Sequence, residues 1–162
     1  MSKSSSKKGI SLVEVVIGIA IIVGAVLASF VYFSLAIKVA RQSAETIQAT
    51  LLVEEGIEAL RVIRDSGYSS GLGSLSKNQD YFLSFSGSTW QSTTASSTID
   101  GVFTRTFFLE EVRRDSNDDI VLTGGSVDPD TLEVTVVVSW QAEDGDQKVL
   151  ETSTYLTNAY ND

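Results

Sequence analysis

The 162-residue sequence contains no cysteine, no histidine and only one proline. Without cysteine the chain can form no disulfide, and it offers neither a thiolate nucleophile nor sulfur ligands for zinc or an iron–sulfur cluster. Without histidine it can build no Ser-His-Asp triad and no histidine-ligated metal site. We therefore expect a protein that is not an enzyme and that carries no cofactor.

Positive charge is also scarce, with 12 Lys and Arg against 21 Asp and Glu and a net charge of −9. Such a chain is a poor general binder of nucleic acid, because attraction to phosphate requires clustered basic residues. Only Arg105, Arg113, Arg114 and Lys148 offer a basic patch for DNA, which makes DNA a weakly supported partner. The mean hydropathy is nevertheless slightly positive, so apolar residues must be concentrated in one part of the chain.

That concentration is a run of 23 uncharged residues from Val15 to Ile37. As a helix the run would span roughly 35 Å, enough to cross a hydrocarbon core of about 30 Å. Lys3, Lys7 and Lys8 precede it, and the positive-inside rule then places the N-terminus in the cytoplasm and the body outside. A cleaved secretory signal would have a shorter apolar region ending in small residues, which does not fit this run.

Glu14 does not fit a plain membrane anchor, because apolar residues stand on both sides of it. A charged side chain at the centre of a membrane helix costs about 2.5 to 3.5 kcal/mol, and such residues mark functional positions. Two interpretations stay open from this residue alone. Glu14 either has a positively charged partner or lies at the interface, close enough to the lysines to be solvated.

The residues from Lys7 to Val15 (KKGISLVEV), followed by the apolar run, resemble the N-terminus of type IV pilins and of the pseudopilins of type II secretion. In that family a prepilin peptidase cuts a short basic leader after Gly and methylates the new N-terminal residue, and a Glu stands fifth in the mature chain. The resemblance implies cleavage between Gly9 and Ile10, N-methylation at Ile10, and an assembly role for Glu14. Lys7 and Lys8 would be the leader charges.

Two departures from the family pattern narrow the resemblance. Ile10 stands where the family usually has Phe, and we expect this apolar exchange to be tolerated. Many major pilins have a proline about twenty residues into the mature chain, whereas the stretch around Val31 has none. This difference favours a minor pilin or a pseudopilin.

The proposed processing has a physical rationale. Cleavage exposes an α-amine at Ile10, one helical turn from Glu14, and a carboxylate in a low-dielectric medium needs such a positive partner. In the family this Glu meets the amine of a neighbouring subunit during assembly. Within the run, Gly24 with Ala28 and Ala25 with Ser29 form small-xxx-small pairs that allow close helix packing.

The helix should continue beyond the membrane, because residues 38 to 65 contain no proline. Val53, Ile57, Leu60 and Ile63 recur at helical spacing and predict a stripe that packs on a sheet. A helix from about Ser11 to Asp65 would be roughly 80 Å long. Half of it must then find partners in lipid and in sister subunits.

Beyond Lys77 the hydrophobic pattern has a period of two. The expected strands are Asp80–Phe85, Val102–Val112, Thr131–Gln141 and Gln147–Thr157. Turns are expected at Arg113–Asp119, Asp128–Asp130 and Glu143–Asp146. The predicted fold class is α+β: a long N-terminal helix, membrane half plus amphipathic half, packed on an antiparallel sheet of about four strands.

Two further segments each allow a structural and a functional interpretation. Ser84–Thr98 is rich in Ser and Thr, which favours a solvated connection or edge segment over a partner-contact or O-glycosylated loop anchored by Trp90. Asp115–Asp119 opens like a calcium loop, but the EF-hand pattern then requires Gly and a distal Glu where the chain has Ile120 and Ser126. A hairpin turn is the better interpretation, and we expect no metal site.

The sequence thus divides into a leader (1–9), a transmembrane and assembly helix (10–38), an amphipathic helix half (39–66) and a β head (67–162). The leading hypothesis is a structural subunit of a pilus or pseudopilus. Its expected partners are sister subunits, prepilin peptidase and inner-membrane lipid. It would sit in the bacterial cytoplasmic membrane with its N-terminus inside and later in an extracellular filament. The alternative is an unprocessed, single-pass, membrane-anchored extracytoplasmic binding or adhesion module.

Overall fold

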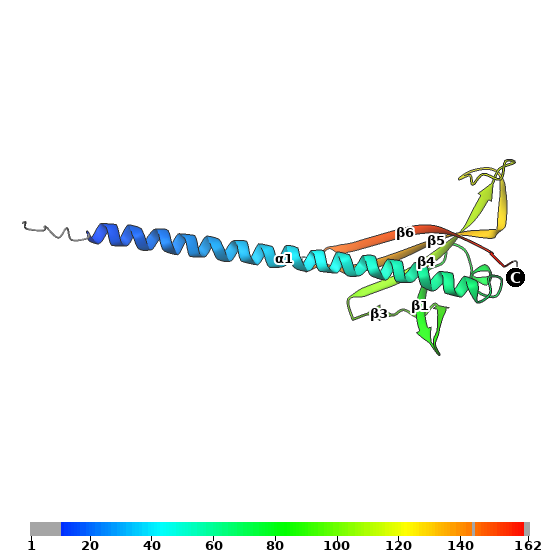
Figure 1. Cartoon of the computed structure of the whole chain (residues 1–162), viewed down its shortest axis with the longest axis horizontal. Coiled ribbons are helices and arrows are strands. Elements are labelled where there is room, and N and C mark those ends of the chain that lie inside the picture. Colours follow the sequence, from blue (N-terminus) through cyan, green and yellow to red (C-terminus); the bar gives the residue numbers. More distant parts are fainter. Residues whose placement is uncertain (1–10, 144, 161–162) are drawn as a thin grey trace, which may run out of the picture. The chain divides into compact units, whose positions relative to one another are not determined.

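The computed structural model describes residues 11–143 and 145–160. Its elements, in chain order (Figure 1), are α1 (Leu12–Asp65), the 3₁₀ helix η1 (Leu72–Ser74), β1 (Tyr81–Ser86), β2 (Thr89–Thr93), β3 (Thr98–Ile99), β4 (Phe103–Arg114), β5 (Ser126–Gln141) and β6 (Gln147–Thr157). The chain forms two compact units, Met1–Ala44 and Glu45–Asp162, and α1 contributes to both. The α+β class is confirmed, and its layout is pilin-like.

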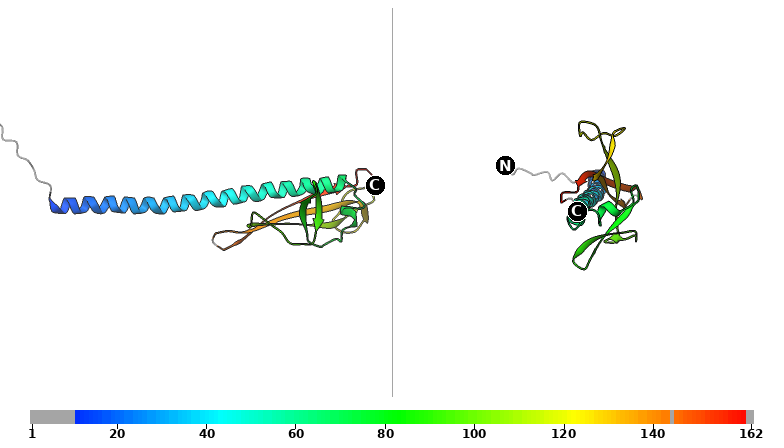
Figure 2. Two further views of the ribbon diagram at one scale, coloured as in Figure 1. Left: turned by 90° about the horizontal axis from the view of Figure 1, so that it is seen from below. Right: turned by 90° about the vertical axis from the view of Figure 1, so that its right-hand side faces the viewer.

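The second part of α1 packs on the sheet through one face (Figure 2). Val53, Leu60 and Ile63 of the predicted stripe are buried, and Ile57 packs partly buried against the same core. The helix ends at Asp65, as expected from the sequence, and Gly67 has a φ of 140° that suits glycine. The stripe was therefore a correct predictor of the buried face.

The sheet is antiparallel, with the strand order β2-β1-β4-β5-β6 and with β3 paired to β4. It has six strands rather than about four. The additional strands are β2, which lies inside the Ser/Thr-rich segment, and the two-residue β3, which begins at the last residue of that segment. The composition of this segment lacks the apolar alternation that marks a half-buried strand. β2 lies at an edge of the sheet, so the prediction of an edge segment is confirmed for this part.

The core lies between α1 and one face of the sheet. Val134, Val136 and Val138 of β5 are fully buried, in agreement with the period of two expected beyond Lys77. Phe107 of β4 lies opposite Val136 and stacks on Tyr81 of β1 with ring centroids 5.6 Å apart. At Gly56 the helix approaches the sheet so closely that a Cβ atom there would lie 2.8 Å from Val136 Cγ1.

A buried arginine links α1 to the sheet. Arg105 of β4 is only 5% exposed, and its Nη1 donates to the backbone carbonyl of Leu52 at 3.0 Å and to Glu55 Oε2 at 2.8 Å. Its guanidinium carbon lies 5.4 Å from the ring centroid of Trp90 on β2. Three separate elements thus meet on one cation, which combines charge pairing with a cation–π contact.

The prediction of a turn at Asp128–Asp130 is wrong, because these residues lie inside β5. The β4–β5 register jumps here: Glu111 pairs with Leu132, whereas Val112 pairs with Asp128. The intervening residues form a bulge, a position that accepts Pro129 because proline has no N–H to donate to the ladder. The same residues therefore change strand pairing without reversing the chain.

Tyr68 and Arg114 hold this bulge in place. The Tyr68 hydroxyl donates to the carbonyl of Pro129 at 3.3 Å, and Arg114 Nε donates to Asp128 Oδ2 at 2.7 Å. The hydrogen bond from Arg114 lowers the pKa of Asp128 below its usual value. Burial, with smaller contributions from Asp130 and Asp128, raises the pKa of Tyr68 from 10.0 to about 12.

Tyr68→Phe is expected to flatten the alkaline loss of stability of the head. Below pH 10 the phenol is protonated in both states. Between the unfolded pKa of 10.0 and the folded pKa of about 12 only the unfolded chain loses the proton, so stability falls as pH rises through this window. Urea unfolding of the detergent-solubilised chain at pH 9, 10 and 11 checks this. Tyr160→Phe, at an exposed tyrosine, is the control, and equal pH slopes for all three chains would contradict the assignment.

Candidate membrane and assembly segment

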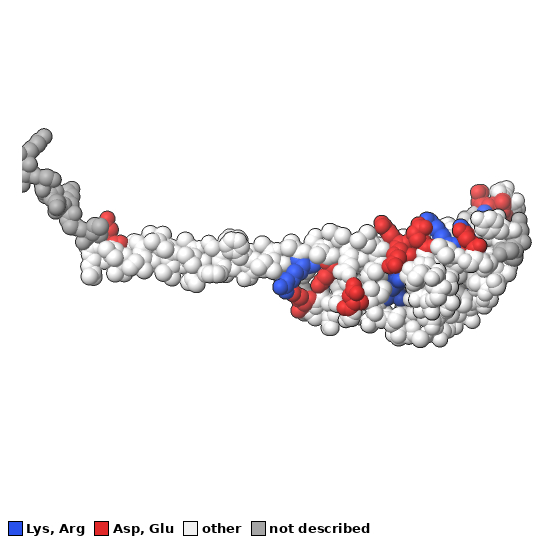
Figure 3. All heavy atoms as spheres, turned by 60° about the horizontal axis from the view of Figure 1, so that its bottom comes forward, with Lys and Arg blue, Asp and Glu red and all other residues white. Residues whose placement is uncertain are grey.

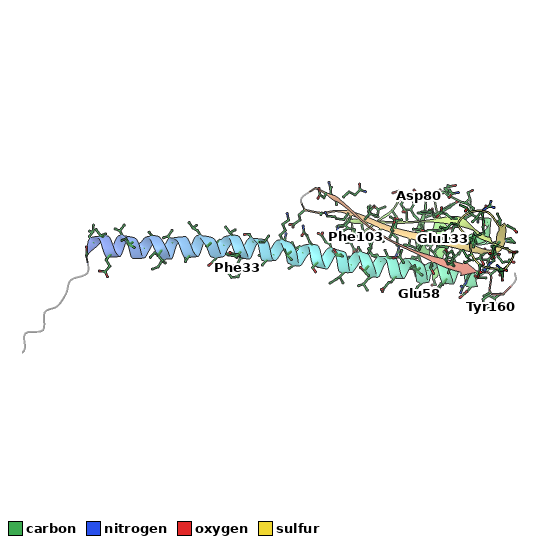
Figure 4. All side chains as sticks on the ribbon, turned by 90° about the horizontal axis from the view of Figure 1, so that it is seen from above. Phe33, Glu58, Asp80, Phe103, Glu133 and Tyr160 are labelled. Carbon is green, nitrogen blue, oxygen red and sulfur yellow. The ribbon has the colours of Figure 1, made fainter. Side chains whose placement is uncertain are left out.

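The first part of α1 is apolar on every side. From Leu12 to Ile37 nearly all large hydrophobic side chains are exposed, and Figure 4 shows those around Phe33 pointing outward from the helix. On the face in Figure 3 acidic atoms lie at the start of this helix, the long stretch beyond them is uncharged, and the other acidic and basic side chains gather toward the opposite end of the molecule. By length and composition α1 is able to cross a membrane, and it is the one such helix within residues 11–143 and 145–160.

The polar groups of this segment are adapted to an apolar medium. Ser29 Oγ donates to the carbonyl of Ala25 at 2.9 Å, and Ser34 Oγ donates to that of Phe30 at 3.0 Å. Bonds of this kind satisfy a hydroxyl inside the helix, which lowers the cost of placing serine in lipid. A Cβ on Gly24 would meet no atom of the chain within 4 Å, so this position is open to another helix, as the small-xxx-small pattern predicts.

Glu14 lies in the first turn of α1. Its backbone N–H donates to the carbonyl of Ser11 at 3.0 Å, and the residue is exposed. A carboxylate in the first turn interacts favourably with the unpaired N–H groups of the helix N-terminus. This local stabilisation is compatible both with pairing to an α-amine and with a solvated, interfacial Glu14.

The other residues of the predicted processing site lie outside the described part of the chain. These are the leader charges Lys7 and Lys8, the residue before the cut, Gly9, and the methylation site, Ile10. Their roles remain predictions from the resemblance. The structure describes the helix that follows them, with Glu14 in its first turn.

The four residues considered for a DNA patch are not brought together. Arg105 is buried, whereas Arg113 and Arg114 lie at the opposite end of β4. Arg114 is paired with Asp128, and Lys148 on β6 lies 3.4 Å from Asp146. The sequence did not predict that Arg105 is buried. Arg105 occupies a core-facing position of β4, where the alternating pattern leads one to expect an apolar residue. A shared phosphate-binding surface does not form from these four side chains.

Of the turn expected at Arg113–Asp119, Asp115–Asp119 forms a turn, whereas Arg113 and Arg114 still belong to β4. Asp115 Oδ1 accepts the N–H groups of Asn117 at 2.8 Å and Asp119 at 3.0 Å, and Asp118 adopts a positive φ of 68°. An aspartate that caps its own turn in this way accounts for the D-x-N-x-D pattern. Among the described residues no group of three or more acidic side chains is arranged to hold a metal ion.

Trp90 is not an exposed anchor. It is partly buried against the core, contacts Phe85 edge-on with ring centroids 5.2 Å apart, and covers the Arg105 guanidinium. These contacts hold the Trp90 ring against the head. The tryptophan therefore contributes to the packing of β2 and does not stand on a free loop. The turn predicted between β5 and β6 is closed by the Ala142 N–H, which donates to the Asp146 carbonyl at 2.9 Å.

Comparisons of the chain with protein-family models, with curated proteins and with solved structures found no match. The resemblance to pilins therefore depends on residues 7–15 and the apolar run that follows. The structure adds a pilin-like layout, in which a long N-terminal helix packs on an antiparallel sheet. Glu14 is not among the core residues through which α1 packs on the sheet.

Proposed function

We propose that the chain is a structural subunit of a type IV pilus or a related secretion pseudopilus. It is cleaved after Gly9, N-methylated at Ile10, held in the cytoplasmic membrane by its apolar helix, and assembled through that helix. The observation that supports this most directly is the exposed apolar length of α1, whose first turn carries Glu14. A long helix continues from it into a head built on an antiparallel sheet.

The exposed apolar surface favours a subunit with two environments. Isoleucine, valine, leucine and phenylalanine side chains between Leu12 and Ile37 are mostly about half exposed or more, so no face of the segment is buried by the chain itself. Apolar surface gains about 25 cal/mol for each Å² removed from water, which makes an aqueous state of this segment unstable. Lipid satisfies it before assembly, and equivalent helices of sister subunits satisfy it in a filament.

A second candidate is an unprocessed, single-pass, membrane-anchored extracytoplasmic binding or adhesion module. The position of Glu14 favours it, because a first-turn carboxylate is stabilised by the helix N-terminus and lies close in sequence to the lysines. In that protein Glu14 would be interfacial and would need no partner subunit. The two candidates differ in the covalent structure of the N-terminus.

Mass spectrometry of the chain purified from membranes of its native host is expected to show a mature N-terminus at Ile10 carrying one added methyl group. Gly9→Leu should leave the chain at full length, because the resemblance places the cut after a glycine. Gly18→Leu is the matched control, since a side chain there would meet no atom of the chain within 4 Å and lies beyond the cut. Wild-type chains that begin at Met1 would exclude the filament proposal and support the anchored module.

A further inference from the structure

A groove lies on the sheet face turned away from α1. The core residues Val134 and Val136 alternate with Glu133 and Thr135, and Val136 meets α1 at Gly56, so Glu133 belongs to the opposite face. Glu133, labelled in Figure 4, lines a groove of about 450 Å³ together with Glu110 and Glu111 of β4 and Tyr155 of β6. The segment Ile120–Leu122, beyond β4, forms its other wall.

The acidic wall carries uncompensated charge. Glu110 and Glu133 are directly paired across β4 and β5, and like charges in this position repel each other. Within the described residues neither of these two carboxylates has a hydrogen bond or ion pair. The carboxylates are therefore available to a positive group from another molecule.

The basic side chains at the groove are already engaged. Lys77 Nζ donates to the carbonyls of Leu75 at 3.1 Å and Gly73 at 3.4 Å, and Arg113 Nη1 donates to that of Gly125 at 3.4 Å. Burial lowers the pKa of Lys77, and the nearby Glu111 carboxylate partly opposes that shift. These cations are directed to backbone oxygens and do not neutralise the Glu110–Glu133 pair.

The other wall is apolar and unusually exposed. Leu122 is 93% exposed and Ile120 is 40% exposed, although both lie beside a groove that a partner could fill. An exposed apolar wall facing uncompensated carboxylates is complementary to a chain segment that alternates basic and apolar side chains. Recognition of a segment that alternates basic and apolar side chains requires both walls.

We propose that this groove binds a basic, partly apolar segment of another protein. Lys or Arg side chains of the segment lie between Glu110 and Glu133, and an adjacent apolar side chain packs on Leu122. The inference extends the proposed function, because a filament built through α1 leaves the face turned away from α1 accessible. Binding itself requires neither processing nor assembly.

The test is a binding titration of the full chain in phosphatidylcholine nanodiscs. The probe is a fluorescent acetyl-Lys-Leu-Lys-Leu-Lys-amide peptide, with empty nanodiscs as the blank. We expect saturable binding that Glu110→Gln/Glu133→Gln weakens by about tenfold, since two charge pairs of modest strength are lost. Glu54→Gln/Glu151→Gln removes the same charge from exposed positions outside the groove and is expected to leave the affinity unchanged.

The apolar wall is tested separately. Leu122→Ser is expected to weaken binding of the Lys-Leu peptide severalfold and to leave a Lys-Ser-Lys-Ser-Lys peptide unaffected. Equal losses in the two double variants would show attraction to net charge alone and would overturn the proposal, as would absence of saturable binding to the wild-type chain. Because the titration uses unprocessed or processed chain alike, its result is independent of the N-terminal mass that tests the proposed function.

Discussion

Glu14→Ala is expected to leave processing and membrane insertion intact while reducing incorporation into filaments by at least about 100-fold. In the proposed filament the carboxylate pairs with the α-amine of a neighbouring subunit inside an apolar helix bundle. Removing one partner of a buried ion pair costs about 3 to 5 kcal/mol, and every 1.4 kcal/mol is a factor of ten in affinity. The apolar surface of α1 remains, so the subunit still inserts into the membrane.

We compare three variants in cells that assemble the wild-type filament. The comparison distinguishes the effect of the charge from the effect of packing. Glu14→Gln keeps the shape and polarity of the side chain, so it should fail nearly as completely as Glu14→Ala. Glu54→Ala removes an exposed glutamate from the head part of the same helix and should assemble normally. The measurement is the amount of subunit in sheared filaments relative to the membrane fraction. Normal filament yield from Glu14→Ala would contradict the pairing and would favour an interfacial Glu14.

Arg105→Ala is expected to be the most destabilising of the head substitutions considered, lowering the free energy of unfolding by about 3 kcal/mol. The arginine fills space between α1 and β2, and truncating a large buried side chain typically costs 2 to 5 kcal/mol. That loss is a substantial fraction of the roughly 5 to 15 kcal/mol that stabilises an ordinary domain.

Companion variants identify which property of Arg105 matters. Arg105→Met keeps most of the volume and removes a buried charge, so we expect it to cost less than half as much as Arg105→Ala. Glu55→Gln should cost less than about 1 kcal/mol, because the Glu55 side chain is 50% exposed and water replaces much of its pairing. Urea unfolding in detergent, followed by tryptophan fluorescence, measures all three. Equal costs for Arg105→Met and Arg105→Ala would show that charge rather than packing is decisive.

Local pattern was sufficient for the elements whose burial follows a simple period. The helix was expected from about Ser11 to Asp65 and runs from Leu12 to Asp65, because its apolar run and amphipathic stripe share one continuous helical register. The alternation of Val134, Val136 and Val138 likewise identified the core face of β5. In each case the residues that determine the structure are neighbours in sequence.

Local pattern failed where a residue's conformation depends on a distant partner. Pro129 suggested a turn, but pairing of β5 with β4 on both sides of the bulge, and with β6 from Thr131 onward, keeps the chain extended. β2 was not predicted as a separate strand because Thr, Ser and Gln carry no strong period, yet its pairing with β1 and the Trp90–Arg105 contact define it. The β4–β5 and Trp90–Arg105 contacts join residues that are distant in sequence, whereas β1 and β2 form a local hairpin across Gly87 and Ser88.

The sequence by itself determined the apolar helix, the acidic head and the placement of Glu14 at the start of the apolar run, since these depend only on composition and helical period. Only the tertiary structure decided that Arg105 is buried against α1 and that Glu110 and Glu133 face each other in a groove. The physical reason is that burial and charge pairing are set by which strands are neighbours. Strand order and register bring together side chains whose separation along the chain carries no signal.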